Sequence, residues 1–383
     1  MNKSHCVGSN RVLKEITRRI YQNRVPLPDY QKTNFRLEKV NNGCFAELWF
    51  QTSGCSHDRS GGCTMCNYGK GKECPDEVVL AEIKKTLSQM PKEYEEFIIS
   101  PIGSMLDPNE VSDRMFEQLQ VALGEIKSEV MITETRADTV TREGLERLRN
   151  LFHSKYQCVE IGAESDDDWI LRNCVNKGCT VEDYKRAIGL IKDAGMNTIV
   201  NIGLGIPFMS ERAAVSYTVR ALYSAQEWGA DSIVLFPYHV KPDTLMGELY
   251  HIHEYTPVSL WSLVEVLGRL DEKLLQKTRI SWYRNYYKEP WKIIESPHTC
   301  EHCYGAVLAL LDEYKNTMGQ DAVRELTELG CACKEEWKRR MEAEDAEISF
   351  QNVERIYRKL ATEYAVDRGV LESEIEIMKR TGK

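Results

Sequence analysis

The strongest constraint on this chain is a regular alternation of short apolar runs with longer amphipathic stretches, which begins near residue 45. Six runs rich in β-branched and apolar residues predict strands at 45–52, 97–101, 130–135, 158–163, 198–204 and 232–238. Amphipathic stretches between them predict helices at 75–90, 109–127, 141–152, 180–194 and 210–228. Alternation in units of about 30 to 40 residues is typical of right-handed parallel βαβ units. The sequence therefore predicts an α/β fold with a six-fold (β/α) sheet, either curled as a partial TIM-like barrel or doubly wound.

The pattern changes to helices alone after about residue 250, with amphipathic stretches at 256–276, 305–317, 322–329 and 350–364. Residues 1–42 carry nine Lys or Arg against three acidic residues, although the whole chain has a net charge of −9. We therefore expect a basic N-terminal helical arm (1–42), a partial barrel (43–250) and a C-terminal helical domain (251–383). The arm either contacts phosphates or packs as a solvated helix on an acidic body.

Composition places the chain among soluble globular proteins, since 42% of its 383 residues are apolar and 28% are charged. Its apolar runs are shorter than the roughly 18 residues of a membrane span, and its first residues lack an apolar signal core. We expect a cytoplasmic protein with no membrane contact. Thirteen cysteines cannot all pair within one chain, and in a reducing compartment clustered cysteines favour metal binding or catalysis.

Three cysteines, Cys55, Cys63 and Cys66, lie in one glycine-rich loop that follows the first predicted strand. Thiolates at this spacing can surround one soft metal centre, and glycines let the backbone pass close to it. Three protein ligands leave an iron–sulfur cluster with an open iron for a substrate or cofactor, whereas structural zinc sites have four. The alternatives are a zinc ion completed by His57 or Asp58, and three unrelated cysteines.

With these residues the sequence resembles the radical S-adenosylmethionine (SAM) superfamily, in which three cysteines of such a loop hold a [4Fe–4S] cluster in a partial (β/α)6 barrel. Within it, the resemblance is to the branch that contains the Elongator catalytic subunit and the radical subunit of archaeosine synthase. The runs that carry it are GCSHDRSGGCTMCNYG, SPIGSMLDP, TETRAD, VEIGAES, NKGCT and GIPFMSE. The resemblance implies that the reduced cluster cleaves SAM into methionine and a 5′-deoxyadenosyl radical, which abstracts hydrogen from a substrate.

Carried over position by position, the resemblance implies that Cys55, Cys63 and Cys66 hold the cluster and that residues at the strand ends contact SAM. These residues are Gly103 and Ser104 for the amino group, Glu134 and Arg136 for the ribose or carboxylate, Glu164 and Ser165 for the ribose, Lys177 for the carboxylate, and Gly203 and Gly205 for adenine. Relatives often carry Gln-Ser where this chain has Glu164-Ser165. Each assignment has an alternative. Gly103 and Ser104 could form a plain strand-to-helix turn, and Glu134 and Arg136 could form a surface ion pair. Gly203 and Gly205 could only relieve crowding in the barrel.

A second cysteine group consists of two short clips, Cys300 and Cys303, then Cys331 and Cys333. Four thiolates suit a closed tetrahedral zinc site or an auxiliary iron–sulfur cluster. We favour zinc, which would hold the helical domain together, over an auxiliary cluster or four cysteines without a metal. His298 or His302 could replace one thiolate.

The sequence thus predicts a radical SAM enzyme whose chemistry is carried by cluster-bound SAM, so no catalytic side chain is assigned. By resemblance, the expected substrate is a tRNA nucleoside of the archaeosine type, with a reductant such as ferredoxin or flavodoxin and a partner subunit for RNA recognition. One alternative keeps the chemistry and acts on a small molecule or peptide, which the acidity of the chain favours. Another is a non-enzymatic scaffold with zinc at both cysteine groups.

Overall fold

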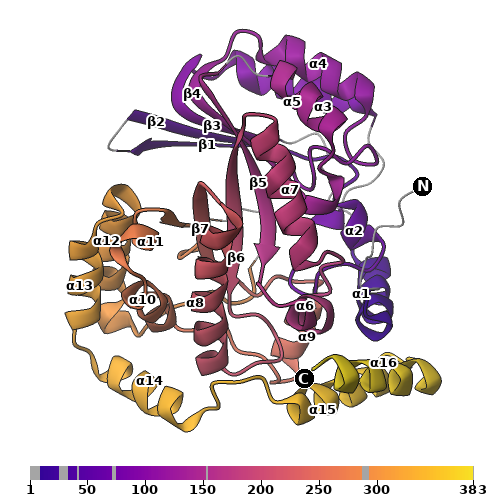
Figure 1. The fold of residues 1–383 in the computed structure, drawn as a ribbon, viewed down its shortest axis with the longest axis vertical. Coiled ribbons are helices and arrows are strands. Elements are labelled where there is room, and N and C mark those ends of the chain that lie inside the picture. The colour runs from indigo at the N-terminus through magenta and orange to yellow at the C-terminus, as the bar shows by residue number, and fades with distance from the viewer. Residues whose placement is uncertain are drawn as a thin grey trace.

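The structure is a computed structural model that describes residues 9–25, 33–40, 43–70, 75–151, 154–286 and 293–382. Its centre is one curled sheet of eight strands in the order β1 to β8 (Figure 1). β1 pairs antiparallel with β2, and every later pair is parallel. The strands are β1 (Thr33–Val40), β2 (Gly43–Phe50), β3 (Glu93–Pro101), β4 (Lys127–Thr135), β5 (Tyr156–Glu164), β6 (Asn197–Leu204), β7 (Ser232–Pro237) and β8 (Thr278–Ile280). The expected α/β class and partial barrel are confirmed.

The six predicted strands are β2 to β7, whereas β1 and β8 were not predicted. β1 falls in the part of the chain expected to be a helical arm, so that expectation is wrong for residues 33–40. Its charged residues are paired instead: Arg36 pairs with Glu47 of β2 at 2.7 Å, and Lys315 pairs with Glu38 at 2.7 Å. β8 has only three residues, too few to show a strand pattern.

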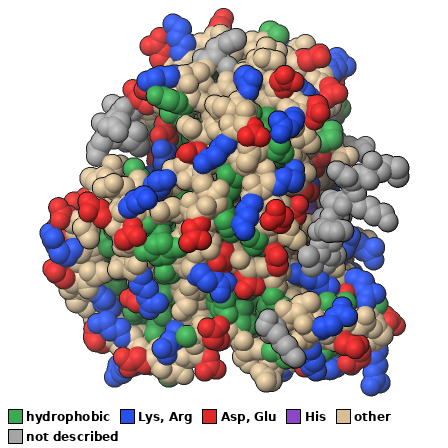
Figure 2. All heavy atoms as spheres, in the orientation of Figure 1, with side chains coloured by type: hydrophobic (Ala, Val, Ile, Leu, Met, Phe, Trp, Pro, Cys, Tyr) green, Lys and Arg blue, Asp and Glu red, His purple; other side chains and the backbone are tan. Residues whose placement is uncertain are grey.

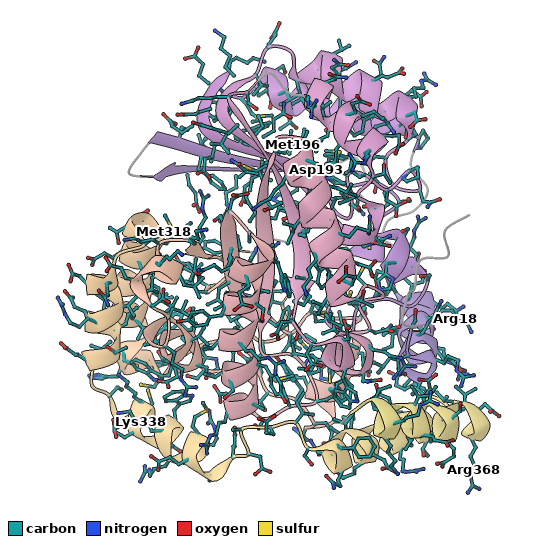
Figure 3. The ribbon with its side chains drawn as sticks, viewed as in Figure 1. Arg18, Asp193, Met196, Met318, Lys338 and Arg368 are labelled. Atoms are coloured by element: carbon teal, nitrogen blue, oxygen red, sulfur yellow. The ribbon has the colours of Figure 1, made fainter. Side chains whose placement is uncertain are left out.

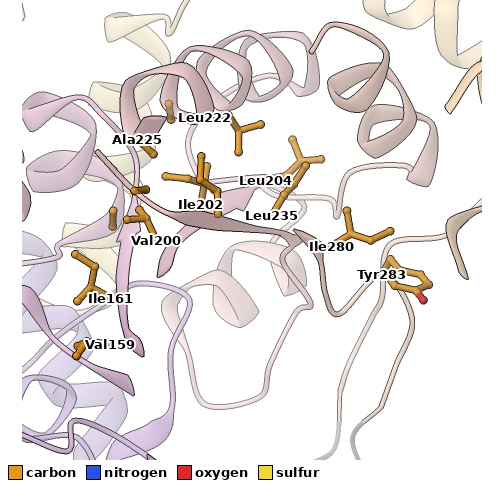
Figure 4. Close-up of a cluster of buried hydrophobic side chains, with 14 of the residues drawn as sticks. Val159, Ile161, Val200, Ile202, Leu204, Leu222, Ala225, Leu235, Ile280 and Tyr283 are labelled. Atoms are coloured by element: carbon orange, nitrogen blue, oxygen red, sulfur yellow. The ribbon is translucent and has the colours of Figure 1, made fainter. Parts of the chain in front are cut away.

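Helices cover the outer face of the sheet because each parallel strand must return through a crossover. They are α3 (Asp76–Ser88), α4 (Asp113–Leu123), α5 (Arg142–Leu151), α7 (Val181–Asp193) and α8 (Glu211–Trp228), with a short α6 (Asp168–Ile170) after β5. Figure 4 shows the packing at β5 to β7, where Ile202 and Leu235 of the sheet lie in one buried cluster with Leu222 and Ala225 of α8. Asp167 caps α6, as the acidic run 166–168 predicts.

A small apolar cluster lies on the inward faces of the central strands. Ile98, Ile132, Cys158 and Ile199 form it, apart from the main core. Nearby, Arg279 of β8 pairs with Glu96 of β3 at 2.7 Å. These residues occupy the amino-terminal half of the barrel, so ligand chemistry is left to the carboxyl edge.

The C-terminal region is helical, as expected, with α9 (Leu245–His251) and α10 (Leu260–Gly268) before β8 and further helices after it. Helix α11 (Glu272–Leu275) also precedes β8. The helices after β8 are α12 (Glu301–Thr317), α13 (Gln320–Glu328), α14 (Ala332–Ala343), α15 (Phe350–Glu363) and α16 (Arg368–Thr381). Side chains of α10, α12, α13 and α14 belong to the same buried cluster as the outer face of the sheet. The proposed division into three domains stays a prediction.

The N-terminal helix α1 (Arg11–Asn23) packs against the C-terminal end of the chain. Its buried residues Val12, Leu13, Ile16 and Ile20 share a core with α15 and α16. Arg18 of α1 and Arg368 of α16 lie on the same side of the molecule (Figure 3). Asn10, the N-cap of α1, donates to Tyr357 of α15 at 3.1 Å. In the described chain, none of the helices is long and apolar enough to cross a membrane.

Candidate active site

The first cysteine group lies in the loop that follows β2, at the carboxyl edge of the parallel strands. Cys55 precedes a short helix, α2 (Ser56–Arg59), and Tyr68 begins the 3-10 turn η1 (Tyr68–Lys70) that ends the loop. Gly54 has a φ of +84°, and a Cβ there would lie 2.3 Å from the Tyr68 carbonyl oxygen. Since the Cys55 amide donates to that same carbonyl at 3.3 Å, the glycine allows the two ends of the loop to close on each other.

A π-helical turn η3 (Leu171–Val175), which follows β5 and α6 in the chain, holds this loop. The Thr64 amide donates to the Val175 carbonyl at 2.9 Å, and its hydroxyl donates to the Cys174 carbonyl at 2.8 Å. Asn176 follows in the left-handed conformation, and its Nδ2 donates to the carbonyls of Gly61 and Gly62 at 2.9 and 2.8 Å. π-Helical turns are rare and concentrate at functional sites. The NKGCT run therefore fixes the backbone between the cysteines.

Each thiol of the group lies near one cation, and each cation follows a different strand. Burial raises the pKa of Cys55, Cys63 and Cys66, to about 12 for Cys66. The positive charges that oppose these shifts are those of Arg136 for Cys55, Lys177 for Cys63 and Lys241 for Cys66. Three half-buried soft donors with positive charge beside them suit an anionic metal–sulfur centre, so the residues present fit the expected cluster.

The two residues considered as completing a zinc site are engaged elsewhere. His57 Nε2 lies 2.9 Å from the Asn176 carbonyl. Asp58 pairs with the buried Arg24 and accepts from the Gly69 amide at 2.6 Å. This arrangement disfavours a fourth ligand from either residue.

Gly103 and Ser104, after β3, lie next to the cysteine loop through the buried carboxylate of Glu110. The Ser104 amide donates to Glu110 Oε2 at 2.6 Å, and the Ser56 amide donates to Oε1 at 2.9 Å. A Cβ on Gly103 would lie 1.8 Å from Glu110 Oε2. Burial raises the pKa of Glu110 to about 7, although both amides and Arg136 favour its charged form. Sequence reasoning missed Glu110, which no motif marked.

Glu134 and Arg136 do not form the charge pair that the sequence suggested. Glu134 lies inside the barrel opposite Glu160 of β5, and burial raises its pKa well above the ordinary value, with Glu160 and Glu47 adding to the shift. Arg136, beyond the end of β4, pairs instead with Asp138, Asp107 and Glu110 at 3.0, 3.3 and 3.5 Å. The strand ends at Thr135, so the two side chains diverge rather than share one face.

Glu164, Lys177 and Tyr238 form a buried chain of contacts. Lys177 Nζ donates to Glu164 Oε1 at 3.0 Å, and the Tyr238 hydroxyl donates to Oε2. Glu164 has a φ of +69°, a strained value for a residue with a side chain, and such strain concentrates at functional sites. The Oγ of the adjacent Ser165 is buried and lacks a hydrogen-bond partner within the described residues, so it can receive a ligand hydroxyl.

The two glycines expected near adenine are explained by the protein's own side chains. A Cβ on Gly203 would lie 2.1 Å from the Tyr238 hydroxyl. A Cβ on Gly205 would lie 3.2 Å from Tyr255 and Val258, and its φ is +96°. The structure therefore favours the alternative that these glycines relieve crowding.

The second cysteine group is assembled at the start of two helices. Cys300 and Cys303 lie at the N-terminus of α12, and Cys331 and Cys333 lie at that of α14. Cys300 Sγ is 3.6 Å from Cys303 Sγ and 3.5 Å from Cys331 Sγ, and Cys333 Sγ is 3.5 Å from those of Cys303 and Cys331. All four sulfurs lie within 4.8 Å of one another. The Trp261 indole N–H donates to Cys333 Sγ at 3.2 Å.

Comparison with known proteins agrees with this geometry. The model of the Radical SAM superfamily matches residues 50–215, which include the three-cysteine loop and the strands around it. Residues 50–215 are thus a radical SAM domain, and the chain is a radical SAM enzyme.

Within the superfamily, the chain is similar to two proteins named archaeosine synthase subunit beta. It is 29% identical to the one from Methanosarcina acetivorans over 77% of this chain and 84% of that protein. It is 27% identical to the one from Thermococcus kodakarensis over 60% of this chain and 73% of that protein. The solved structure of Elp3 from Methanocaldococcus infernus is 17% identical, with a TM-score of 0.46 over 62% of this chain and 59% of that one.

Proposed function

We propose that Cys55, Cys63 and Cys66 hold a [4Fe–4S] cluster and that the enzyme uses it to cleave SAM reductively. The observation that supports this most directly is the set of three half-buried thiols in one loop, each beside a cation, at the carboxyl edge of a radical SAM domain. Bound there, the cluster would supply the electron that converts SAM into methionine and a 5′-deoxyadenosyl radical. The electron would come from a small reductant of the ferredoxin or flavodoxin type.

The chain's own residues would bind and orient SAM. Ser165 offers a buried hydroxyl to the ribose. Lys177 lies between Glu164 and the cysteine loop, where its charge can attract the methionyl carboxylate. The Glu110 carboxylate beside Gly103 and Ser104 can attract the methionyl amino group. The buried side chains around this edge would also exclude water from a reactive radical.

The proposed substrate is a tRNA nucleoside, with radical remodelling of a side chain on an archaeosine-type base. Its support is the similarity to two proteins named archaeosine synthase subunit beta, a name that also favours a partner subunit. The partner would contribute to RNA binding, because this chain is acidic overall and Figure 2 shows basic and acidic side chains interspersed over the visible face. A small molecule or peptide substrate is the second candidate, favoured by the same acidity.

We further propose that the second cysteine group binds one zinc ion. A tetrahedral ion with Zn–S bonds of about 2.3 Å sets its sulfurs ~3.8 Å apart. Neighbouring sulfurs here are 3.5 to 3.6 Å apart, close to that edge. The thiolates of a four-iron cluster each bind a different iron and are spread more widely, so the spacing favours a single ion over an auxiliary cluster.

The test is anaerobic purification and reconstitution, with iron, sulfide and zinc counted per chain, followed by a dithionite assay for 5′-deoxyadenosine. We expect about four irons and one zinc per chain. Cys63→Ala should abolish 5′-deoxyadenosine formation and keep the zinc. Iron-free protein, or undiminished 5′-deoxyadenosine in Cys63→Ala, would contradict the proposal. Binding of tRNA with a steep salt dependence would separate the RNA substrate from the small-molecule alternative.

A further inference from the structure

Arg136 was expected to contact SAM, but most of the donors of its guanidinium are already engaged by the protein. Its Nε and Nη2 donate to the two carboxylate oxygens of Asp138 at 3.0 and 3.2 Å. Its Nη2 also lies 3.3 Å from Asp107 Oδ2. Its Nη1 donates to Ser56 Oγ at 2.9 Å and to Cys55 Sγ at 3.8 Å. A guanidinium has five N–H donors, and four of them make these hydrogen bonds, while its charge is also neutralised by Asp107 and Glu110.

The position of Arg136 is fixed from several sides. Its own amide donates to Ser104 Oγ at 3.1 Å, which ties the end of β4 to the end of β3. Asp107 and Glu110 come from the segment after β3, and Asp138 comes from the 3-10 turn η2 (Ala137–Thr139). Only 16% of the Arg136 side chain is exposed. A long side chain held by three carboxylates cannot swing to another partner without losing several charge-assisted hydrogen bonds.

The contact with Cys55 gives this cation a role toward the cluster. A cysteine sulfur that ligates iron carries negative charge, and reduction of the cluster adds more. Hydrogen bonds to such sulfurs and nearby positive charge stabilise the reduced form and raise the reduction potential. Arg136 also stands between the Cys55 sulfur and three carboxylates whose negative charge would act in the opposite direction.

We propose that Arg136 is a positioning residue of the cluster: held by Asp107, Glu110 and Asp138, it donates to the Cys55 sulfur and sets the reduction potential. This inference rests on the proposed function, since it requires a cluster on Cys55. It reassigns Arg136 from SAM binding to the support of the cluster. Asp138 contacts the guanidinium at two points, since its two oxygens accept from two different nitrogens, and its negative charge offsets the positive charge of Arg136.

The test is the midpoint potential of the reconstituted cluster without SAM, measured by a redox titration followed by electron paramagnetic resonance. Arg136→Gln removes a positive charge beside the sulfur and should lower the potential. Asp138→Asn removes a negative charge from the same ion pair and should raise it. Arg136→Lys keeps the positive charge but loses the planar guanidinium that contacts Asp138 at two points. Its midpoint potential should lie between those of wild type and Arg136→Gln. Arg279→Gln, in the amino-terminal half of the barrel, is the matched control.

The inference is overturned if Arg136→Gln and Asp138→Asn shift the potential in the same direction, or if neither shift exceeds that of Arg279→Gln. If Arg136→Gln holds no cluster, Asp138→Asn decides: a higher potential supports the role and an unchanged one refutes it. Failure of the proposed function would look different, because wild-type protein would then hold no iron and give no signal to titrate.

Discussion

Two facing glutamates inside the barrel are the residues whose presence is hardest to explain by stability. Glu134 and Glu160 lie opposite each other on β4 and β5, and Glu47 of β2 adds to the negative charge around them. Burial raises the pKa of both Glu134 and Glu160. Burying like charges together costs free energy. A chain selected only for stability would place apolar residues here, so this layer indicates a role in function.

The stability of the protein should therefore depend on pH through this layer. The folded chain keeps these protons to higher pH than the unfolded chain does, so unfolding releases protons. The free energy of unfolding should then fall as pH rises above about 4.3, the ordinary glutamate pKa. Glu134→Gln should raise the thermal midpoint at pH 8, and the gain should shrink toward pH 4.5. The exposed Glu117→Gln is the control for surface charge. A lower midpoint at pH 8 in Glu134→Gln would refute the argument.

At the scale of elements, the π-helical turn η3 after β5 fixes the backbone of the cysteine loop through hydrogen bonds. Asn176 combines a left-handed backbone, which asparagine tolerates better than most residues, with two buried hydrogen bonds to Gly61 and Gly62. The turn is itself held from the far side by Tyr357 of α15, whose hydroxyl donates to the Asn173 carbonyl at 2.6 Å. Helix α15 thus supports the loop through the turn η3.

Substitution of Asn176 should loosen the cysteine loop. Asn176→Gly keeps the backbone conformation and loses the two hydrogen bonds, which should reduce stability by about 1–3 kcal/mol. Asn176→Ala should lose more, because alanine also resists the left-handed region. Thermal unfolding and the iron retained after gel filtration measure both effects. Equal iron retention in wild type and in both variants would show that the loop does not depend on this clamp.

The sequence predicted most strands and helices because each strand is a short apolar run and each crossover helix is a longer amphipathic stretch. Strands β2 to β7 were expected, and the cysteine loop was placed correctly at the end of the first of them. It could not predict which strand-end groups meet, because contacts such as Arg136 with Asp107, or Asn176 with Gly61, join segments far apart in the chain. It also missed β1, since a paired edge strand with alternating charges resembles an exposed segment.

At the scale of the whole molecule, the C-terminal helices are held to the barrel by polar contacts around the second cysteine group. Trp261 of α10 donates to Cys333, and Trp337 of α14 donates to Ser262 of α10 at 3.1 Å. Glu211 at the start of α8 accepts from the Trp337 indole at 3.2 Å and pairs with Arg340. A metal ion at the four thiols would therefore connect α10, α12, α14 and, through Glu211, the barrel helix α8.

Removal of that ion should loosen the C-terminal helices while leaving the first site able to bind iron. Structural zinc contributes directly to folding free energy, so Cys331→Ser should lose one zinc per chain and unfold at a lower temperature. Hydrogen exchange should quicken in α12 to α14 more than in β4 to β6, because those helices depend on the thiol clips for their relative placement. The iron count should stay at the wild-type value, since Cys55, Cys63 and Cys66 lie in a separate loop, after β2.

The matched control is Cys44→Ser, which changes a free cysteine that belongs to neither group. Loss of iron instead of zinc from Cys331→Ser would assign an iron–sulfur cluster to this group and overturn the zinc proposal.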